Sequence, residues 1–245
     1  MIRFIVPVVI LLVWFICADI FKITPFFFPS LIDTLSKLND FIIQGLMLED
    51  IENTIIRWFT GFILACIVSI PIGLLIGYSE KAYISTNFLI DFCRSLPVTA
   101  IFPLYLIVFG IGDASKIAMV FTVVFFVVLL SAIYGVRYSS PLKKEMSILF
   151  GANEWQIFRY VIFYEAIPQI MIGIRLSISL SLIVVIVSEM FIGTEHGIGQ
   201  MIFDSYQNNV IDELYATILI AGTLGYLLNV IFYNLEKKII FWVGK

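Results

Sequence analysis

Long apolar runs separated by short polar connections make up most of this chain. Six of them are predicted to cross a membrane as helices: residues 4–20, 54–78, 88–109, 117–134, 167–191 and 214–233. About 20 apolar residues suffice for one crossing, because a helix rises ~1.5 Å per residue and the hydrocarbon core is ~30 Å thick. The pattern therefore predicts an all-α integral membrane protein with six transmembrane helices.

Two of the apolar runs are irregular. The first, behind Arg3, could be a cleaved signal peptide, but no small-x-small cleavage site follows it, which favours a retained helix. The third is interrupted by Pro97 and Pro103. Broken helices are tolerated in lipid only where the freed backbone groups face protein or a water-filled path. Pro97 and Pro103 are therefore candidate residues of a transport pathway.

The polar connections divide a single predicted membrane domain, residues 1–245, into seven segments. They are the first helix (1–21), a long polar connection (22–53), helices two to four (54–135), a polar loop (136–166), the fifth helix (167–191), a second connection (192–213) and the sixth helix with its tail (214–245). In the long connection, apolar residues at helical spacing predict an amphipathic helix at the membrane interface. These residues are Leu31, Leu35, Leu38, Ile42 and Ile43.

The composition agrees with a membrane protein and excludes other classes. At 61% hydrophobic and 13% charged residues, with a mean hydropathy of +1.04, the chain is far more apolar than a soluble domain. No lysine- or arginine-rich run suggests nucleic-acid binding. Cys17, Cys66 and Cys93 stand singly without histidine partners, so neither a metal site nor a disulfide framework is expected. No cluster of His, Asp, Glu or Ser has catalytic spacing, which argues against a membrane-embedded enzyme and leaves no catalytic residue to name.

The distribution of lysine and arginine predicts the orientation. Nine lie on the side of the two termini and the polar loop: Arg3, Lys81, Arg137, Lys143, Lys144, Arg159, Lys237, Lys238 and Lys245. The opposite side carries only Lys22, Lys37 and Lys116. The positive-inside rule therefore places both termini and the loop at 136–166 in the cytoplasm, while the connections 22–53 and 192–213 face outward.

The polar loop is predicted to contain two short helices joined by a glycine bend. Ser140 followed by Pro141 is typical of a helix start. The serine hydroxyl can accept from an early backbone N–H, and proline has no N–H at the first helical position, where such a group would have no partner within the helix. Gly151 suits the end of that helix, since glycine takes a positive φ without a Cβ penalty. Asn153 and Gln156 form a capping-box pair that begins a second helix, expected to end near residue 163.

Apolar side chains in this loop exceed what a solvated loop needs. They are Ile148, Leu149, Phe150, Trp155, Ile157 and Phe158. Exposed apolar clusters mark interaction sites, so we expect a partner to cover this surface.

The spacing of three positions in the loop resembles a known family. Glu145, Gly151 and Val161 follow the spacing of the EAA loop of ABC-importer permeases, whose pattern is Glu-Ala-Ala, Gly, then Ile-x-Leu-Pro. Met and Ser replace the two alanines here, and Tyr164 replaces the proline. The stretches at 52–62, 93–117, 173–190 and 197–202 also resemble the permease subunits of the nitrate, sulfonate, taurine and thiamine-precursor import group, so that the resemblance covers roughly residues 29 to 242.

This resemblance implies a type I importer permease of MetI-like architecture in the inner membrane of a prokaryote. In that family two permease subunits, here expected as a homodimer, form the pathway through the lipid membrane, and an extracytoplasmic solute-binding protein delivers the solute. Separate cytoplasmic ATPases bind ATP and Mg, so no cofactor is expected in this chain, and the lack of a Walker A loop agrees. The residues expected to couple to the ATPase are Glu145, Gly151, Ala152, Asn153, Trp155 and Val161.

Two ionisable residues of the fifth helix are further pathway candidates. Arg175 and Glu189 are fourteen positions apart, close to four turns at ~3.6 residues each, so they share a helix face at a separation of about 21 Å and cannot pair. Ionisable groups inside a membrane usually face a cavity or a partner, which places Arg175 toward the cytoplasm and Glu189 near the outer mouth of a pathway. The alternative is that Arg175 reaches carbonyls of neighbouring helices and Glu189 caps the outer loop.

A stand-alone secondary transporter or channel is the alternative function. Such proteins are expected to show internal repeats or paired intramembrane charges, and no convincing repeat is present. The apolar, aromatic-rich crossings do not encode a particular solute, and in the resembling family specificity rests largely with the binding protein. The sequence therefore predicts an import permease for a small organic or inorganic solute.

Overall fold

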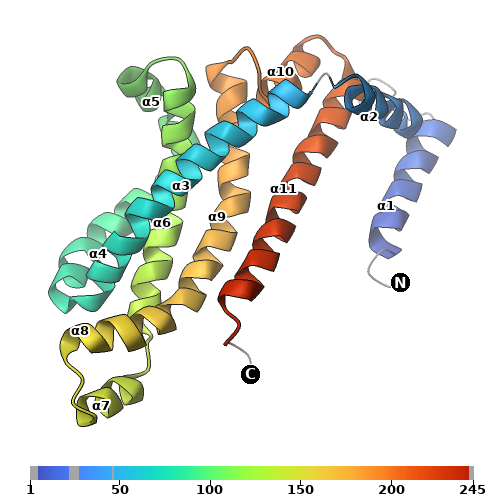
Figure 1. Cartoon of the computed structure of the whole chain (residues 1–245). Coiled ribbons are helices and arrows are strands. Elements are labelled where there is room, and N and C mark those ends of the chain that lie inside the picture. The colour runs from blue at the N-terminus through green and yellow to red at the C-terminus, as the bar shows by residue number, and fades with distance from the viewer. Residues whose placement is uncertain (1–4, 22–27, 46, 243–245) are drawn as a thin grey trace. The chain divides into compact units, whose positions relative to one another are not determined.

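The computed structural model describes residues 5–21, 28–45 and 47–242, and every regular element in these ranges is helical (Figure 1). The α-helices are α1 (Ile5–Phe15), α2 (Leu31–Gln44), α3 (Leu48–Tyr78), α4 (Glu80–Ser95), α5 (Phe102–Phe109), α6 (Asp113–Arg137), α7 (Pro141–Leu149), α8 (Glu154–Ile157), α9 (Phe163–Ile192), α10 (Ile198–Gln207) and α11 (Ile211–Ile239). Two π-helical turns follow α1 (Ile16–Ile20) and α8 (Phe158–Ile162), and a 3₁₀ turn (Val98–Ile101) precedes α5.

Four helices among the described residues are long and apolar enough to cross a membrane. They are α3, α6, the continuous helix from Glu154 to Ile192, and α11. The pair formed by α4 and residues 98–109 would be a fifth crossing, bent by 79° at its break. The first predicted crossing corresponds to the apolar helix Val8–Ile20, which is shorter than the other spans. Length and composition thus support four or five crossings, and the sixth stays a prediction.

Several helix ends differ from the predicted ones. α3 begins at Leu48, earlier than the apolar run suggested, because the preceding polar residues continue the helix. A new helix starts directly after α3, before the predicted third run at residue 88: Ser79 Oγ accepts from the N–H of Ala82 at 3.3 Å, and α4 begins at Glu80. The predicted break at Pro97 is confirmed.

By its contacts the chain divides into two compact units, residues 1–55 with 189–224 and residues 56–188 with 225–245. The first unit contains the predicted amphipathic helix as α2. Phe41 of this helix packs with Met47 and Ala216 in a small apolar core. Ile42 and Ile43 are exposed on α2, and such a face suits contact with the lipid interface.

In the second unit, small residues of α3 lie against α6. A Cβ at Gly61 would stand only 2.7 Å from the carbonyl oxygen of Ile117. Ala65 and Ser69 are fully buried, and Gly73 one turn further on again touches α6. Small residues at four-residue spacing let two membrane helices approach closely, which fixes α3 and α6 as a rigid pair.

Candidate functional site

The loop from Ser140 to Glu165, called the 140–165 loop below, has the local structure that its sequence predicts. α7 ends at Leu149, and Gly151 follows with φ +80°, a conformation that strains most L side chains. Asn153 Oδ1 accepts from the N–H of Gln156, and Gln156 Oε1 accepts from the N–H of Asn153, each at 2.9 Å. The glycine bend and the capping box are both confirmed.

Two other predictions for the loop are wrong. The Ser140 hydroxyl makes no capping bond, and its backbone N–H donates instead to Glu165 Oε2 at 2.7 Å. The second helix does not end near residue 163, because α8 passes through a π-turn directly into α9 and one helix runs from Glu154 to Ile192. A π-turn accommodates an extra residue without breaking the backbone ladder.

The loop presents a large apolar surface. Leu149, Phe150 and Trp155 are 85%, 86% and 65% exposed. Trp155 stacks on Phe158, with 6.0 Å between ring centroids, which holds the indole in a defined orientation. Ile157 is buried, so its predicted place in this surface is wrong. The exposed side chains are available to a partner without rearrangement.

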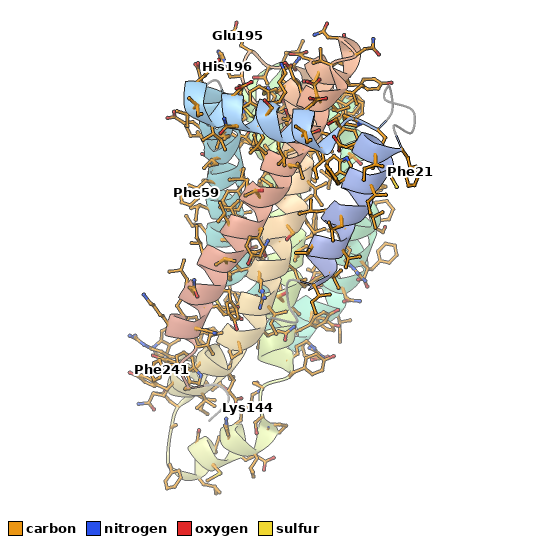
Figure 2. All side chains as sticks on the ribbon, turned by 90° about the vertical axis from the view of Figure 1, so that its right-hand side faces the viewer. Phe21, Phe59, Lys144, Glu195, His196 and Phe241 are labelled. Atoms are coloured by element: carbon orange, nitrogen blue, oxygen red, sulfur yellow. The ribbon has the colours of Figure 1, made fainter. Side chains whose placement is uncertain are left out.

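The remaining residues predicted to couple to the ATPase also lie in this loop. Glu145 and Asn153 are exposed, whereas Ala152 and Val161 are partly buried. Figure 2 shows the loop beyond the end of α6, with Lys144 on α7. The structure therefore brings the predicted coupling residues together on one projecting element.

Arg175 lies half-exposed on α9 beside α11. Its Nη1 is 3.6 Å from Glu236 Oε2, and its guanidinium sits over the Tyr233 ring at 5.1 Å from the centroid. Arg175 and Glu236 border a cavity of about 490 Å³ whose other polar side chains are Ser179 and Asn229. The Asn229 amide donates to Ser179 Oγ at 3.0 Å. A guanidinium, its carboxylate partner and an amide–hydroxyl pair therefore share one cavity.

Glu189, the other ionisable candidate, is fully buried. Its carboxylate accepts from Thr54 Oγ1 at 3.0 Å and from the N–H of Gly199 at 3.0 Å. Thr54 Oγ1 in turn accepts from the N–H of Ile198 at 3.0 Å. A Cβ at Gly197 would stand 2.7 Å from the Glu189 carboxyl carbon. This arrangement caps the N-terminus of α10 and corresponds to the capping role that the sequence left open beside the pathway role.

Pro97 and Pro103 lie at the bend between α4 and α5. Pro97 precedes the 3₁₀ turn, and Pro103 lies in the first turn of α5. Both are exposed. Nearby, Arg94 Nε pairs with Asp91 Oδ1 at 2.8 Å on the surface of α4.

Sequence reasoning missed a charged cluster where α3 meets the start of α6. Arg57 Nε lies 2.7 Å from Asp113 Oδ1, and Lys116 Nζ lies 3.7 Å from the same oxygen. Lys116, assigned from the sequence to an outer loop, is almost completely buried. Its position one turn after Asp113 was the available signal, because residues three apart on a helix are neighbours. Within the described ranges, no group of three or more His, Cys, Asp or Glu could hold a metal ion.

Comparison with known proteins identifies the family. The sequence model described as binding-protein-dependent transport system inner membrane component matches residues 69–241, well over half of the chain. The chain belongs to this family. It is the permease subunit of an ABC importer, a multi-pass inner membrane protein whose ATPase is a separate partner. The family binds no cofactor itself, and the predicted division of labour with an ATPase chain is confirmed.

Curated relatives match this permease over most of their length. A Bacillus subtilis (strain 168) permease protein named for aliphatic sulfonates transport, SsuC, is 26% identical over 236 residues, 96% of this chain and 85% of that protein. The taurine transport system permease protein TauC of Escherichia coli (strain K12) is 26% identical over 242 residues, 97% of this chain and 88% of that protein. The nitrate import permease protein NrtB of Synechocystis sp. is 28% identical over 184 residues, 75% and 66% of the two chains.

Solved structures show the fold. A chain of the inward-facing MetNI methionine ABC transporter superposes with a TM-score of 0.66 at 18% identity, covering 80% of this permease and 97% of that chain. A chain of an amino acid ABC transporter crystallised with histidines gives a TM-score of 0.60 at 19% identity, covering 80% and 95%. The permease therefore has the MetI-like fold of type I importers.

Proposed function

We propose that this permease crosses the inner membrane six times with both termini in the cytoplasm, acts as a homodimer, and imports a small solute delivered by an extracytoplasmic binding protein. The excess of lysine and arginine on one side supports this orientation. With the bent pair counted as the fifth span, the shorter apolar helix Val8–Ile20 supplies the proposed sixth crossing.

The observation that carries the proposal is the exposed apolar surface of the 140–165 loop. Leu149, Phe150 and Trp155 are exposed on an element that we propose to be cytoplasmic, and the charge distribution supports this side. Covering such side chains is favourable by about 25 cal/mol per Å² of apolar surface. In the proposed complex this surface seats in the ATPase, and Glu145, Gly151, Ala152, Asn153 and Val161 shape or border the contact. Because no break separates α8 from α9, a movement of the ATPase is transmitted along this continuous helix to the fifth crossing, α9.

The proposed pathway passes Arg175. The relatives above are named for sulfonates, taurine and nitrate, which favours a small oxyanion as the solute of this permease as well. A guanidinium presents donors in a planar fork that suits oxyanions, and the half-exposed Arg175 opens on a cavity of about 490 Å³. Pro97 and Pro103 border the proposed pathway at the bend of the third crossing, and Glu189 shapes its outer end by holding α10.

Uptake into proteoliposomes tests the proposal. The permease is reconstituted with and without its ATPase and binding protein, and labelled taurine or nitrate is added with ATP. Uptake is expected only when all components and ATP are present, whereas uptake by the permease alone would support a stand-alone transporter instead. In the same assay Arg175→Ala is expected to lower uptake with normal assembly, and Arg175→Lys to lower it less. Normal uptake by the Arg175→Ala permease would contradict a role of Arg175 in the pathway.

A further inference from the structure

Glu165, in the first turn of α9, is a carboxylate that none of the roles above uses. Its Oε2 accepts from the backbone N–H of Ser140 at 2.7 Å, and its Oε1 lies 2.5 Å from Lys143 Nζ. The side chain is only 18% exposed. Ser140 is the N-cap of α7, and Lys143 lies in its first turn. One carboxylate therefore joins the two ends of the 140–165 loop, and we call these three residues the Glu165 tie.

Apolar burial contributes little to holding α7 in place. This helix has no buried residue, whereas α8 is anchored through the buried Ile157. The orientation of α7 relative to α9 therefore depends largely on polar contacts. A hydrogen bond to a charged acceptor is stronger than one between neutral groups, so the Glu165 tie is well suited to this task.

The backbone that carries Glu165 is itself fixed. Ala166, the next residue, is fully buried. It packs against Gly135 of α6, where a Cβ would stand 2.9 Å from the Ala166 carbonyl oxygen. The carboxylate thus projects from a firm junction between α6 and α9, and a displacement of α7 pulls directly on that junction.

We propose that Glu165 is a positioning residue that couples movement of α7 to the fifth crossing. The inference rests on the proposed role of the 140–165 loop as the ATPase contact. With the tie intact, the ATPase moves α7, α8 and α9 as one body. Without the tie, the apolar surface still binds the ATPase, but α7 turns about its junction with α6. Part of the ATPase movement then no longer reaches the fifth crossing, α9.

Variants of the tie separate its two contacts. Glu165→Ala removes both, Glu165→Gln keeps an acceptor for the Ser140 N–H but loses the charge, and Lys143→Met removes only the ion pair. In proteoliposomes with the ATPase and binding protein, ATP hydrolysed per solute taken up is expected to rise on the order of tenfold for Glu165→Ala, since hydrogen bonds to charged groups are worth about that factor or more. The ratio of ATP hydrolysed to solute taken up should rise less for the other two variants. Lys144→Met is the matched control, because Lys144 makes no ion pair with any other described residue and should leave the ratio unchanged.

Two further measurements separate positioning from damage to the fold. Hydrogen exchange of the Ser140 amide should be about tenfold faster in Glu165→Ala, while co-purification with the ATPase stays at the unaltered level. The exchanged pair Lys143→Glu with Glu165→Lys restores the ion pair but not the acceptor for Ser140, so its ratio should lie below that of either single charge reversal.

Some outcomes would overturn the inference. They are an unchanged ratio of ATP to solute in Glu165→Ala, an unchanged Ser140 exchange rate, or a complete loss of ATPase association in that variant. A failure of the proposed function itself would show differently, as uptake by the unaltered permease without any ATPase.

Discussion

Helices α8 and α10 of this permease each begin behind a glycine, but the start of α8 is exposed and that of α10 is buried. α8 follows Gly151, and its first turn is capped by Asn153, which is exposed. α10 follows Gly197, and its first turn is held by Thr54 and Glu189, both fully buried. The first cap uses two residues that are three positions apart in the chain, and the second uses residues from two other helices.

This difference separates an adaptable helix start from a fixed one. At α8 water can replace a lost bond, so an exposed cap contributes about 1 kcal/mol. At α10 a lost partner leaves buried donors without water, and each such group costs roughly 1–3 kcal/mol, more where a charge is involved. The contact proposed for the ATPase therefore lies at a helix start that tolerates substitution, whereas the start of α10 does not tolerate it.

The largest expected effect follows from removing the buried cap. Glu189→Ala leaves the Thr54 hydroxyl without its acceptor and the Gly199 N–H unpaired, so we expect a loss of roughly 3 kcal/mol or more in stability. The thermal unfolding midpoint of the purified permease in detergent should fall, with less monodisperse protein on gel filtration. Glu195→Ala is the matched control, because Glu195 is an exposed carboxylate in the loop before α10 (Figure 2). A Glu189→Ala permease with an unchanged midpoint but no uptake would instead support the pathway role.

The same contrast explains what the sequence could predict. The cap of α8 was predictable because Asn153 and Gln156 are three residues apart and carry the signature themselves. α10 was not predicted, since its N-terminal donors are satisfied from Thr54, 144 positions from Ile198, and from Glu189. Tertiary packing brings these distant residues to the start of α10, so no local sequence pattern could predict them.

Apolar runs predicted the spans but not their ends or the buried charges. The break at Pro97 was visible because proline lacks a donor. The continuity of α8 with α9 was not, because a π-turn has no local sequence signature as clear as a cap. Lys116 was placed in an outer loop because it lies near the end of an apolar run, yet an ion pair with Asp113 accompanies its burial.

An intermediate effect is expected at the glycine bend. A Cβ at Gly151 would meet nothing within 4 Å, so its φ of +80° is the only local obstacle to a side chain. An L-residue there costs about 1–2 kcal/mol, which the fold should withstand. Gly151→Arg should insert and fold but lose ATPase co-purification or coupled uptake, because a long charged side chain stands beside the apolar surface. Gly151→Asn should retain both, since asparagine tolerates this conformation. Unimpaired uptake by Gly151→Arg would refute the role of the bend.

The smallest effect should come from the exposed cap. Asn153→Ala removes the acceptor for the Gln156 N–H, and we expect about 1 kcal/mol less stability at the start of α8. The global unfolding midpoint should barely move, because water solvates the freed donor, whereas hydrogen exchange of the Gln156 amide should accelerate about fivefold. Asn153→Asp keeps an acceptor and should exchange at the unaltered rate. If Asn153→Ala lowered the midpoint as far as Glu189→Ala, the start of α8 would be as intolerant as that of α10, and the distinction between an adaptable and a fixed helix start would fail.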